Sequence, residues 1–117
     1  MPTRVLIVDD HASFRAAARA MLEADGFEVV GEAVDGTGAL VACGRLEPAV
    51  VLLDIQLPDL DGFAVAERLS QQRRPPQVVL VSSRGAAGYR RRLAGAPVCG
   101  FLTKSELSSE SLATMLR

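Results

Sequence analysis

Carboxylates, a hydroxyl and an amine directly follow short apolar runs of this 117-residue chain. Asp9 and Asp10 follow the first run, Asp54 follows the third, Ser82 ends the fourth, and Lys104, the only lysine, follows the last. Two carboxylates about 4 Å apart repel by about 4 kcal/mol at an effective dielectric of 20, so a crowded group of three favours a shared cation. Oxygen ligands of this kind suit Mg²⁺. These residue types therefore predict a magnesium-dependent site, provided that the fold brings them together.

Asp54 is suited to accept a phosphoryl group, because an unpaired carboxylate oxygen can act as the nucleophile. A divalent cation and Lys104 would neutralise charge on the phosphoryl oxygens, and Ser82 could donate a hydrogen bond to one of them. Aspartates in such places also cap helices and loops, but capping does not account for the serine and the lysine. His11 is a weaker ligand candidate, since it opens the first expected helix and should point away from the acids.

The apolar runs are expected to be strands, and longer amphipathic stretches separate them. Continuous β-branched runs are typical of strands covered on both faces, and they lie at 5–8, 29–30, 50–53, 78–81 and 101–102. Helices are expected over about 12–25, 37–46, from 62 to before the prolines at 75–76, over 87–93, and after an N-cap at Ser108. The fourth helix should be short or mobile, because each interior glycine costs about 1 kcal/mol relative to alanine.

This alternation predicts a parallel sheet with helices on both faces. In such a sheet the ligand site lies at the carboxyl ends of the strands. The acids, the serine and the lysine all fall at that edge, so the expected fold brings the candidate site together.

The composition narrows the class of protein. Hydrophobic residues make up 49% and charged residues 23%, which suits one folded domain. The net charge of −1 argues against electrostatic binding of nucleic acid by this segment. No apolar run reaches about 18 residues, and the N-terminus lacks a signal-peptide pattern, so we expect no membrane contact and a cytoplasmic location. Cys43 and Cys99 lack metal-ligand spacing and are expected to be free thiols.

Arg90, Arg91 and Arg92 form a basic run that could suggest nucleic-acid contact. Three adjacent residues of a helix spread over about 200°, so they cannot all face one ligand. We expect a solvated face, with contact to a protein partner as the alternative.

The sequence resembles the receiver domain of bacterial two-component response regulators over essentially the whole chain, residues 1–117. The resemblance rests on the order and spacing of Val5–His11, Leu53–Pro58 with Asp61-Gly62, Val81–Ser83 and Gly100–Lys104. It implies a flavodoxin-like, doubly wound α/β fold with five parallel strands in the order 2-1-3-4-5 and five helices.

The resemblance also implies a role for each residue around the acids. Asp54 would be the phosphoacceptor. Asp10 and Asp54 would bind Mg²⁺ directly, together with the main-chain carbonyl of Gln56, while Asp9 would act through water. Lys104 would bind the phosphoryl group.

Ser82 and Phe101 would be the switch residues, the hydroxyl moving toward the phosphoryl group and the ring turning inward. Gln56 and Arg84 lie two residues after the acceptor and the switch serine, where the family lines the path of attacking water. We expect Arg84 to slow hydrolysis, with a solvated side chain as the alternative. Ser105 replaces a proline found in many receivers, so a looser loop or a trans peptide bond is expected there.

The implied partner is a sensor histidine kinase, and the face from the fourth to the fifth helix would change partner contacts or form a homodimer. The motif at residues 9–11 and Ser105 are similar to regulators with a LuxR-type helix-turn-helix, which would bind DNA through a domain outside these residues. On this interpretation the chain is a signalling switch, not an enzyme. Alternatives are a stand-alone regulator, a degenerate receiver that only binds proteins, and a Mg²⁺-dependent aspartyl-phosphate phosphatase. The phosphatase would need an acid where this chain has Gln56.

Overall fold

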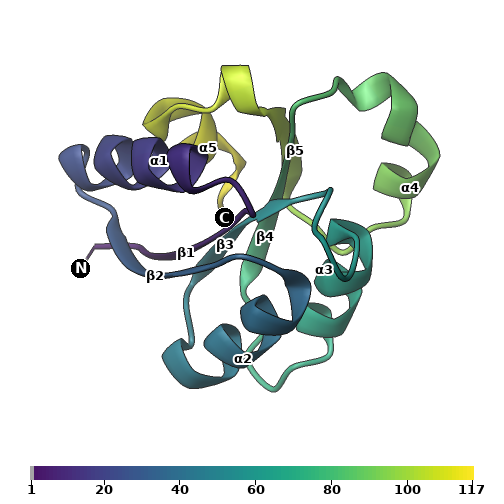
Figure 1. Cartoon of the computed structure of the whole chain (residues 1–117), viewed down its shortest axis with the longest axis horizontal. Helices are drawn as coiled ribbons and strands as arrows, with labels where there is room; N and C mark the ends of the chain where they lie inside the picture. The colour runs from purple at the N-terminus through teal and green to yellow at the C-terminus, as the bar shows by residue number, and fades with distance from the viewer. Residues whose placement is uncertain (1) are drawn as a thin grey trace.

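Five parallel strands form one sheet between two layers of helices (Figure 1). The computed structural model describes residues 2–117. The strands are β1 (Arg4–Val8), β2 (Glu28–Ala33), β3 (Val50–Asp54), β4 (Gln77–Ser82) and β5 (Gly100–Thr103). Their order is β2-β1-β3-β4-β5, and every neighbouring pair is parallel. The predicted fold class and strand order are confirmed.

The helices are α1 (Ala12–Ala24), α2 (Gly36–Leu46), α3 (Gly62–Ser70), α4 (Arg90–Ala94) and α5 (Ser109–Met115). Figure 1 shows α1 and α5 on one face of the sheet and α2 and α3 on the other. Two short 3₁₀ segments, Ala86–Tyr89 and Lys104–Glu106, precede α4 and α5. The fourth predicted helix is thus a 3₁₀ turn followed by a five-residue α-helix, as its glycine content favours. No helix within residues 2–117 is long and apolar enough to cross a membrane.

The sheet separates two hydrophobic clusters. Leu6 and its alternate neighbours pack against α2 and α3, where Leu69 is fully buried. Ile7 and its alternate neighbours pack against α1 and α5, where Leu22 and Leu112 are fully buried. Full burial of such a side chain contributes about 1.5–3 kcal/mol. Both faces of the three inner strands, β1, β3 and β4, are therefore covered, which explains why their sequences are apolar without alternation.

Local hydrogen bonds fix where several helices begin and end. Asp35, Asp61 and Ser108 each accept the main-chain N–H three residues further on, which caps α2, α3 and α5. The predicted cap at Ser108 is confirmed. Gly26 has a φ of 90°, and this left-handed residue follows the end of α1.

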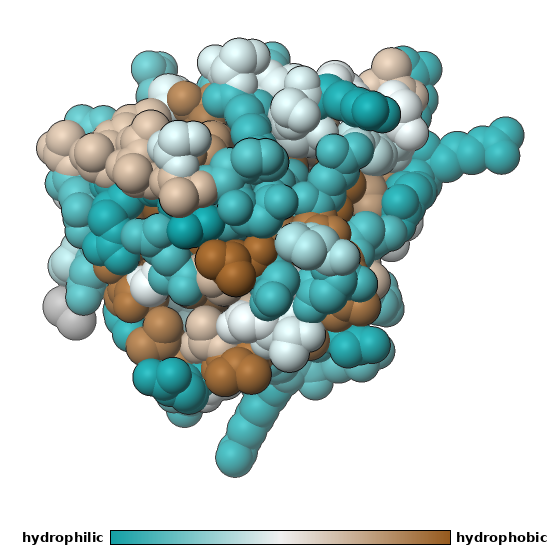
Figure 2. All heavy atoms as spheres, viewed as in Figure 1, coloured by the Kyte–Doolittle hydropathy of each residue, from teal (hydrophilic) through white to brown (hydrophobic). Residues whose placement is uncertain are grey.

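Hydrophilic side chains cover most of the surface seen in Figure 2. Hydrophobic side chains interrupt its lower half, where Figure 1 places α2. The exposed large hydrophobic residues in the described part of the chain are Val34 and Val41.

Candidate functional site

The carboxyl ends of β1, β3 and β5 bring the predicted site residues together. Asp54 ends β3, and Asp9 directly follows β1, its neighbour in the sheet. Lys104 follows β5, and its Nζ lies 2.7 Å from Asp9 Oδ2 and 3.3 Å from Asp54 Oδ2. Residues separated by up to 95 positions thus meet at one edge, as the strand pattern predicts.

Four side chains at this edge form a compact group of possible metal ligands. One ligand atom each from Asp9, Asp10, His11 and Asp54 lies within 4.8 Å of the others. Asp9 and Asp54 are buried, whereas Asp10 and His11 lie at the exposed rim. The group therefore combines a desolvated floor with a side open to solvent.

The expectation that His11 points away from the acids is wrong. Its Nδ1 lies 3.0 Å from Asp10 Oδ1 and 3.1 Å from Asp9 Oδ1. His11 is the N-cap residue of α1 and has an extended backbone, and its own N–H donates to Asp9 Oδ1 at 2.8 Å. This local turn places the imidazole ring beside the carboxylates. The position of His11 in the sequence did not indicate this contact.

The electrostatics of the buried groups leave an excess of negative charge. Burial raises the pKa of Asp54, and the charge on Asp9 raises it further, against opposing contacts from Gln56 and Lys104. Burial would lower the pKa of Lys104, but contacts with Asp9 and Asp54 outweigh it and raise that pKa. One protonated amine therefore faces two carboxylates, with Asp10 beside them.

The donor set fits a hard divalent cation. Asp9 Oδ2 is buried and has no aligned hydrogen-bond donor among residues 2–117, although Lys104 Nζ approaches it. Asp10 and Asp54 add carboxylate oxygens, the ligands that Mg²⁺ prefers. Such an ion would coordinate the buried oxygen that lacks an aligned donor. It would also neutralise the net negative charge at this edge of the sheet.

The other predicted residues surround Asp54. Gln56 N–H donates to Asp54 Oδ1 at 3.1 Å. Ser82 is buried, and its Oγ accepts the Arg84 N–H at 3.0 Å. The Arg84 side chain is exposed and makes no ion pair or hydrogen bond with the described residues. Phe101 is half-buried, with its ring 6.2 Å from that of Tyr89.

The Lys104–Ser105 bond is trans, one of the two alternatives expected for the loop after β5, since there is no cis peptide bond within residues 2–117. Sequence reasoning missed Phe14, whose ring centroid lies 4.7 Å from Lys104 Nζ. Phe14 carried only the signal of a core position on the first helix, and its place over the lysine follows from the packing of α1.

The basic run is not a uniformly solvated face. Arg92 Nη2 lies 2.6 Å from Asp61 Oδ2, and its guanidinium lies 4.2 Å from the centroid of the Phe63 ring. Arg90 and Arg91 are exposed, as expected. Arg92 is exposed too, but its contact with Asp61 was not foreseen, because the two residues are 31 positions apart in the sequence.

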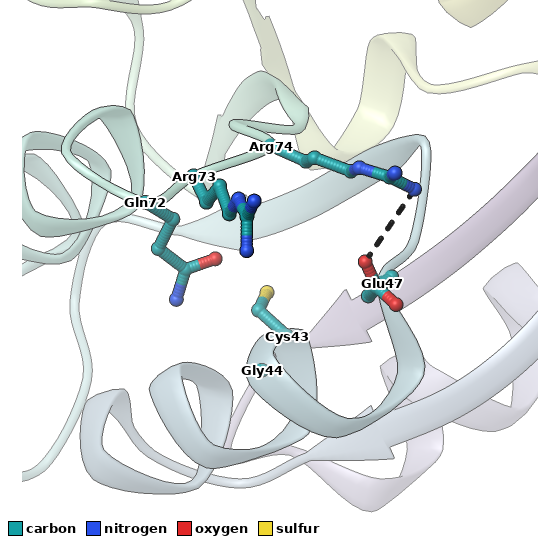
Figure 3. A pocket seen from close by; sticks show the side chains of 6 residues that line it. All are labelled: Cys43, Gly44, Glu47, Gln72, Arg73 and Arg74. Atoms are coloured by element: carbon teal, nitrogen blue, oxygen red, sulfur yellow. Dashed lines mark ion pairs between the residues drawn. The ribbon is translucent and has the colours of Figure 1, made fainter.

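A cavity of about 520 Å³ lies away from the acids, near the C-terminal ends of α2 and α3 (Figure 3). Its lining contains none of the predicted site residues: Cys43, Gly44, Glu47, Gln72, Arg73 and Arg74. Burial raises the pKa of the Cys43 thiol to about 11, so this thiol is protonated and unreactive at neutral pH. Both cysteines are free, as predicted.

The strand order and the two helical layers define a flavodoxin-like α/β domain with a charged site at the carboxyl edge of its sheet. Residues 5–117 match the response regulator receiver domain, and the chain belongs to this family. The chain is thus related to the signalling switches of two-component systems.

Known relatives agree with this assignment. BvgA of Bordetella pertussis, described as a positive transcription regulator of virulence factors, is 37% identical over 106 residues, which are 91% of this chain and 51% of BvgA. A protein-glutamate methylesterase/protein-glutamine glutaminase of Myxococcus xanthus is 47% identical over 85 residues, 72% of this chain and 24% of that protein. The signal receiver domain of NarL from Mycobacterium tuberculosis has a TM-score of 0.84 at 32% identity, covering 97% of this chain and 96% of that one.

The chain spans about half the length of the curated transcription regulators it matches and a quarter of the methylesterase. Within this chain, the receiver domain covers residues 5–117.

Proposed function

We propose that this chain is a phosphoacceptor domain, residues 1–117, in which Asp54 takes a phosphoryl group from the phosphohistidine of a sensor histidine kinase. The single observation that carries the proposal is the contact of the Lys104 amine with both Asp9 and the buried Asp54 at the carboxyl edge of the sheet. A structural lysine needs no second buried acid, whereas phosphoryl transfer needs a nucleophile and a cation side by side.

In the proposed transfer, an Asp54 carboxylate oxygen attacks phosphorus. The bond to that oxygen forms as the bond from phosphorus to the kinase imidazole nitrogen breaks, and the imidazole keeps the electron pair. Lys104 Nζ, 3.3 Å from Asp54 Oδ2, is placed to bind an oxygen of the transferred group. Asp10, Asp54 and the Gln56 carbonyl would hold Mg²⁺, with Asp9 acting through water. The ion would neutralise charge on the phosphoryl oxygens.

Ser82 and Phe101 are the proposed switch residues. The Ser82 hydroxyl accepts a hydrogen bond from Arg84 N–H and keeps its own proton for donation, which leaves it able to turn toward a phosphoryl oxygen. Moving an equilibrium from 1:99 to 99:1 takes about 5.5 kcal/mol of differential interaction. Two or three hydrogen bonds to a charged group, each contributing about 1.5–3 kcal/mol, are of this size.

The readout is proposed to be the face from α4 through β5 to α5, which would change partner contacts or form a homodimer. A transcriptional output is favoured, because BvgA matches more of this chain than the methylesterase does. DNA would then be bound by a LuxR-type helix-turn-helix domain in a segment outside these residues, and the protein would act in the cytoplasm as a switch.

The test of this proposal is labelling with acetyl phosphate and Mg²⁺. The wild-type protein is expected to gain one phosphoryl group by intact mass, and Asp54→Ala is expected to gain none. Arg91→Ala, at an exposed residue outside the site, is the control and should label like the wild type. Labelling of Asp54→Ala at another residue would overturn the assignment of the acceptor.

Arg84 is proposed to slow loss of the phosphoryl group, because its exposed side chain is two residues from Ser82 and makes no other ion pair in the described part of the chain. Arg84→Ala is expected to raise the dephosphorylation rate about tenfold, which is about 1.4 kcal/mol of barrier. The rate is measured by loss of label after removal of acetyl phosphate. An unchanged rate would show that the side chain is merely solvated.

A further inference from the structure

The loop between β3 and α3, residues 55–61, has a base that its own main chain closes. Gly62 N–H donates to the Ile55 carbonyl at 2.7 Å. A Cβ at Gly62 would lie 2.6 Å from the Asp54 carbonyl oxygen and 2.8 Å from Ile55 Cα, so the two ends of the loop are in direct contact. The base is therefore fixed without any side chain from the middle of the loop.

The tip of this loop is held from outside by Asp59. Its Oδ1 accepts the Gly36 N–H at 2.7 Å, and its Oδ2 accepts the Thr37 N–H at 2.9 Å and the Thr37 hydroxyl at 2.7 Å. These donors belong to the first turn of α2, more than twenty residues earlier in the sequence. The Leu60 N–H adds a fourth bond at 2.8 Å, within the loop itself. One carboxylate thus caps α2 and anchors the loop.

The anchored segments are also in close contact. A Cβ at Gly36 would lie 2.9 Å from Leu60 Cβ and 2.9 Å from Val65 Cγ2, so the start of α2 packs directly on the loop and on α3. Asp35 caps the same helix through the Gly38 N–H at 2.7 Å, without a hydrogen bond to the loop in the described structure. The two carboxylates share the role of helix cap, and of the two only Asp59 also joins α2 to the loop by hydrogen bonds.

We propose that Asp59 is a positioning residue for the acceptor site. By fixing the tip of residues 55–61 to α2, it supports the short hairpin at whose base Gln56 bridges Asp61. The Gln56 N–H in turn contacts Asp54 Oδ1 at 3.1 Å. This inference rests on the proposed function, in which Asp54 and the Gln56 carbonyl bind Mg²⁺. Without the anchor, this hairpin opens more readily, and the Gln56 carbonyl is then held less firmly relative to Asp54.

The test compares Asp59→Ala with Asp35→Ala, because each variant removes one cap from the same helix. Amide hydrogen exchange of residues 55–61 is measured without ligand, and the Kd for Mg²⁺ is measured by calorimetry. Asp59→Ala is expected to show faster exchange in the loop and about tenfold weaker Mg²⁺ binding, the low end of what supporting hydrogen bonds contribute. Asp35→Ala is expected to keep both values, while urea unfolding shows a similar loss of stability for the two variants.

Asp59→Asn keeps an acceptor oxygen for the Gly36 N–H and is expected to fall between Asp59→Ala and the wild type. If Asp59→Ala does not fold, Thr37→Val removes only the hydroxyl donor and should show the same changes at smaller size. Equal loop exchange and equal Mg²⁺ affinity in the two alanine variants would overturn the proposal. If the wild type binds no Mg²⁺, the proposed function fails, and loop exchange still decides whether Asp59 is the anchor.

Discussion

Asp54 occupies a position that is unfavourable for a carboxylate. It is 3% exposed and shares the Lys104 amine with Asp9. Burial and the Asp9 charge raise the pKa of Asp54 above its ordinary value of 3.8. The ionised form is therefore less stable in the folded chain than in the unfolded chain. The proposed nucleophile thus reduces the stability of the free domain.

Asp54→Asn is accordingly expected to increase the free energy of unfolding at pH 7 by about 1–4 kcal/mol, the repulsion of two charges about 4 Å apart at effective dielectrics between that of water and 20. Because the folded-state pKa is the higher one, the cost of ionised Asp54 is present above that pKa. It disappears as the pH falls below the unfolded value of 3.8, where both states are protonated. Urea unfolding of both proteins at pH 7 and at pH 3.5 measures the difference. If the difference in unfolding free energy between the two proteins stayed constant on acidification, this account would be contradicted.

The sequence predicted the positions of those site residues that lie at the end of a strand. Asp9, Asp54 and Lys104 meet because each directly follows a buried apolar run of a parallel sheet. The direction of the His11 ring and the position of Phe14 over Lys104 were not predictable, since both depend on how the first turn of α1 packs.

At the scale of elements, α4 is the most weakly attached helix. Its residues are exposed or half-buried, and none is fully buried. Arg92 ties it to Asp61, the cap of α3, and lies over Phe63. The prediction of a short fourth helix was correct because a glycine destabilises a helix at its own position, independently of the rest of the fold. The contact between Arg92 and Asp61 was not predictable, because it joins two segments that are far apart in the sequence.

Arg92→Ala is expected to lower the free energy of unfolding by about 1 kcal/mol, the sum of a largely exposed ion pair and a cation–π contact. Burial raises the pKa of Asp61, but hydrogen bonds from Arg92 and the Ala64 N–H outweigh it and lower that pKa. The contribution of this ion pair to stability is therefore present above pH 3.8, and it is lost as the pH falls through the lowered pKa of Asp61. Hydrogen exchange of residues 86–94 should also quicken at neutral pH. Arg91→Ala is the matched control, and an equal effect of both variants would exclude the tie.

At the scale of the whole molecule, two layers of helices pack closely on one sheet, and the acids lie at the carboxyl edge of that sheet. On the side of α2 and α3, Gly62, the first residue of α3, lies in close contact with the end of β3. The alternation of strands and helices predicted the layers and the strand order. It did not predict the anchor of Asp59 on α2, because that contact joins a loop to the first turn of a helix more than twenty residues earlier in the sequence.

Gly62→Ala is expected to destabilise the domain by about 2 kcal/mol or more, since the added Cβ meets main-chain atoms that cannot move independently. Gly44→Ala is the matched control within α2, because a Cβ there has open space within 4 Å. It is expected to increase stability by about 0.5–1 kcal/mol through helix propensity. Thermal unfolding of both variants gives the comparison. A Gly62→Ala protein as stable as the wild type would show that the loop base is free to shift.

The strand order also has a consequence for the chain as it leaves the ribosome. β1 is the first strand to be synthesised, but it lies between β2 and β3, so it lacks one neighbour until residue 54 has emerged. The amine that offsets Asp9 and Asp54 arrives later still, with residue 104. Until residue 104 has emerged, the nascent chain therefore carries these acids without this counter-charge, and the five-stranded sheet is incomplete until β5 has been synthesised.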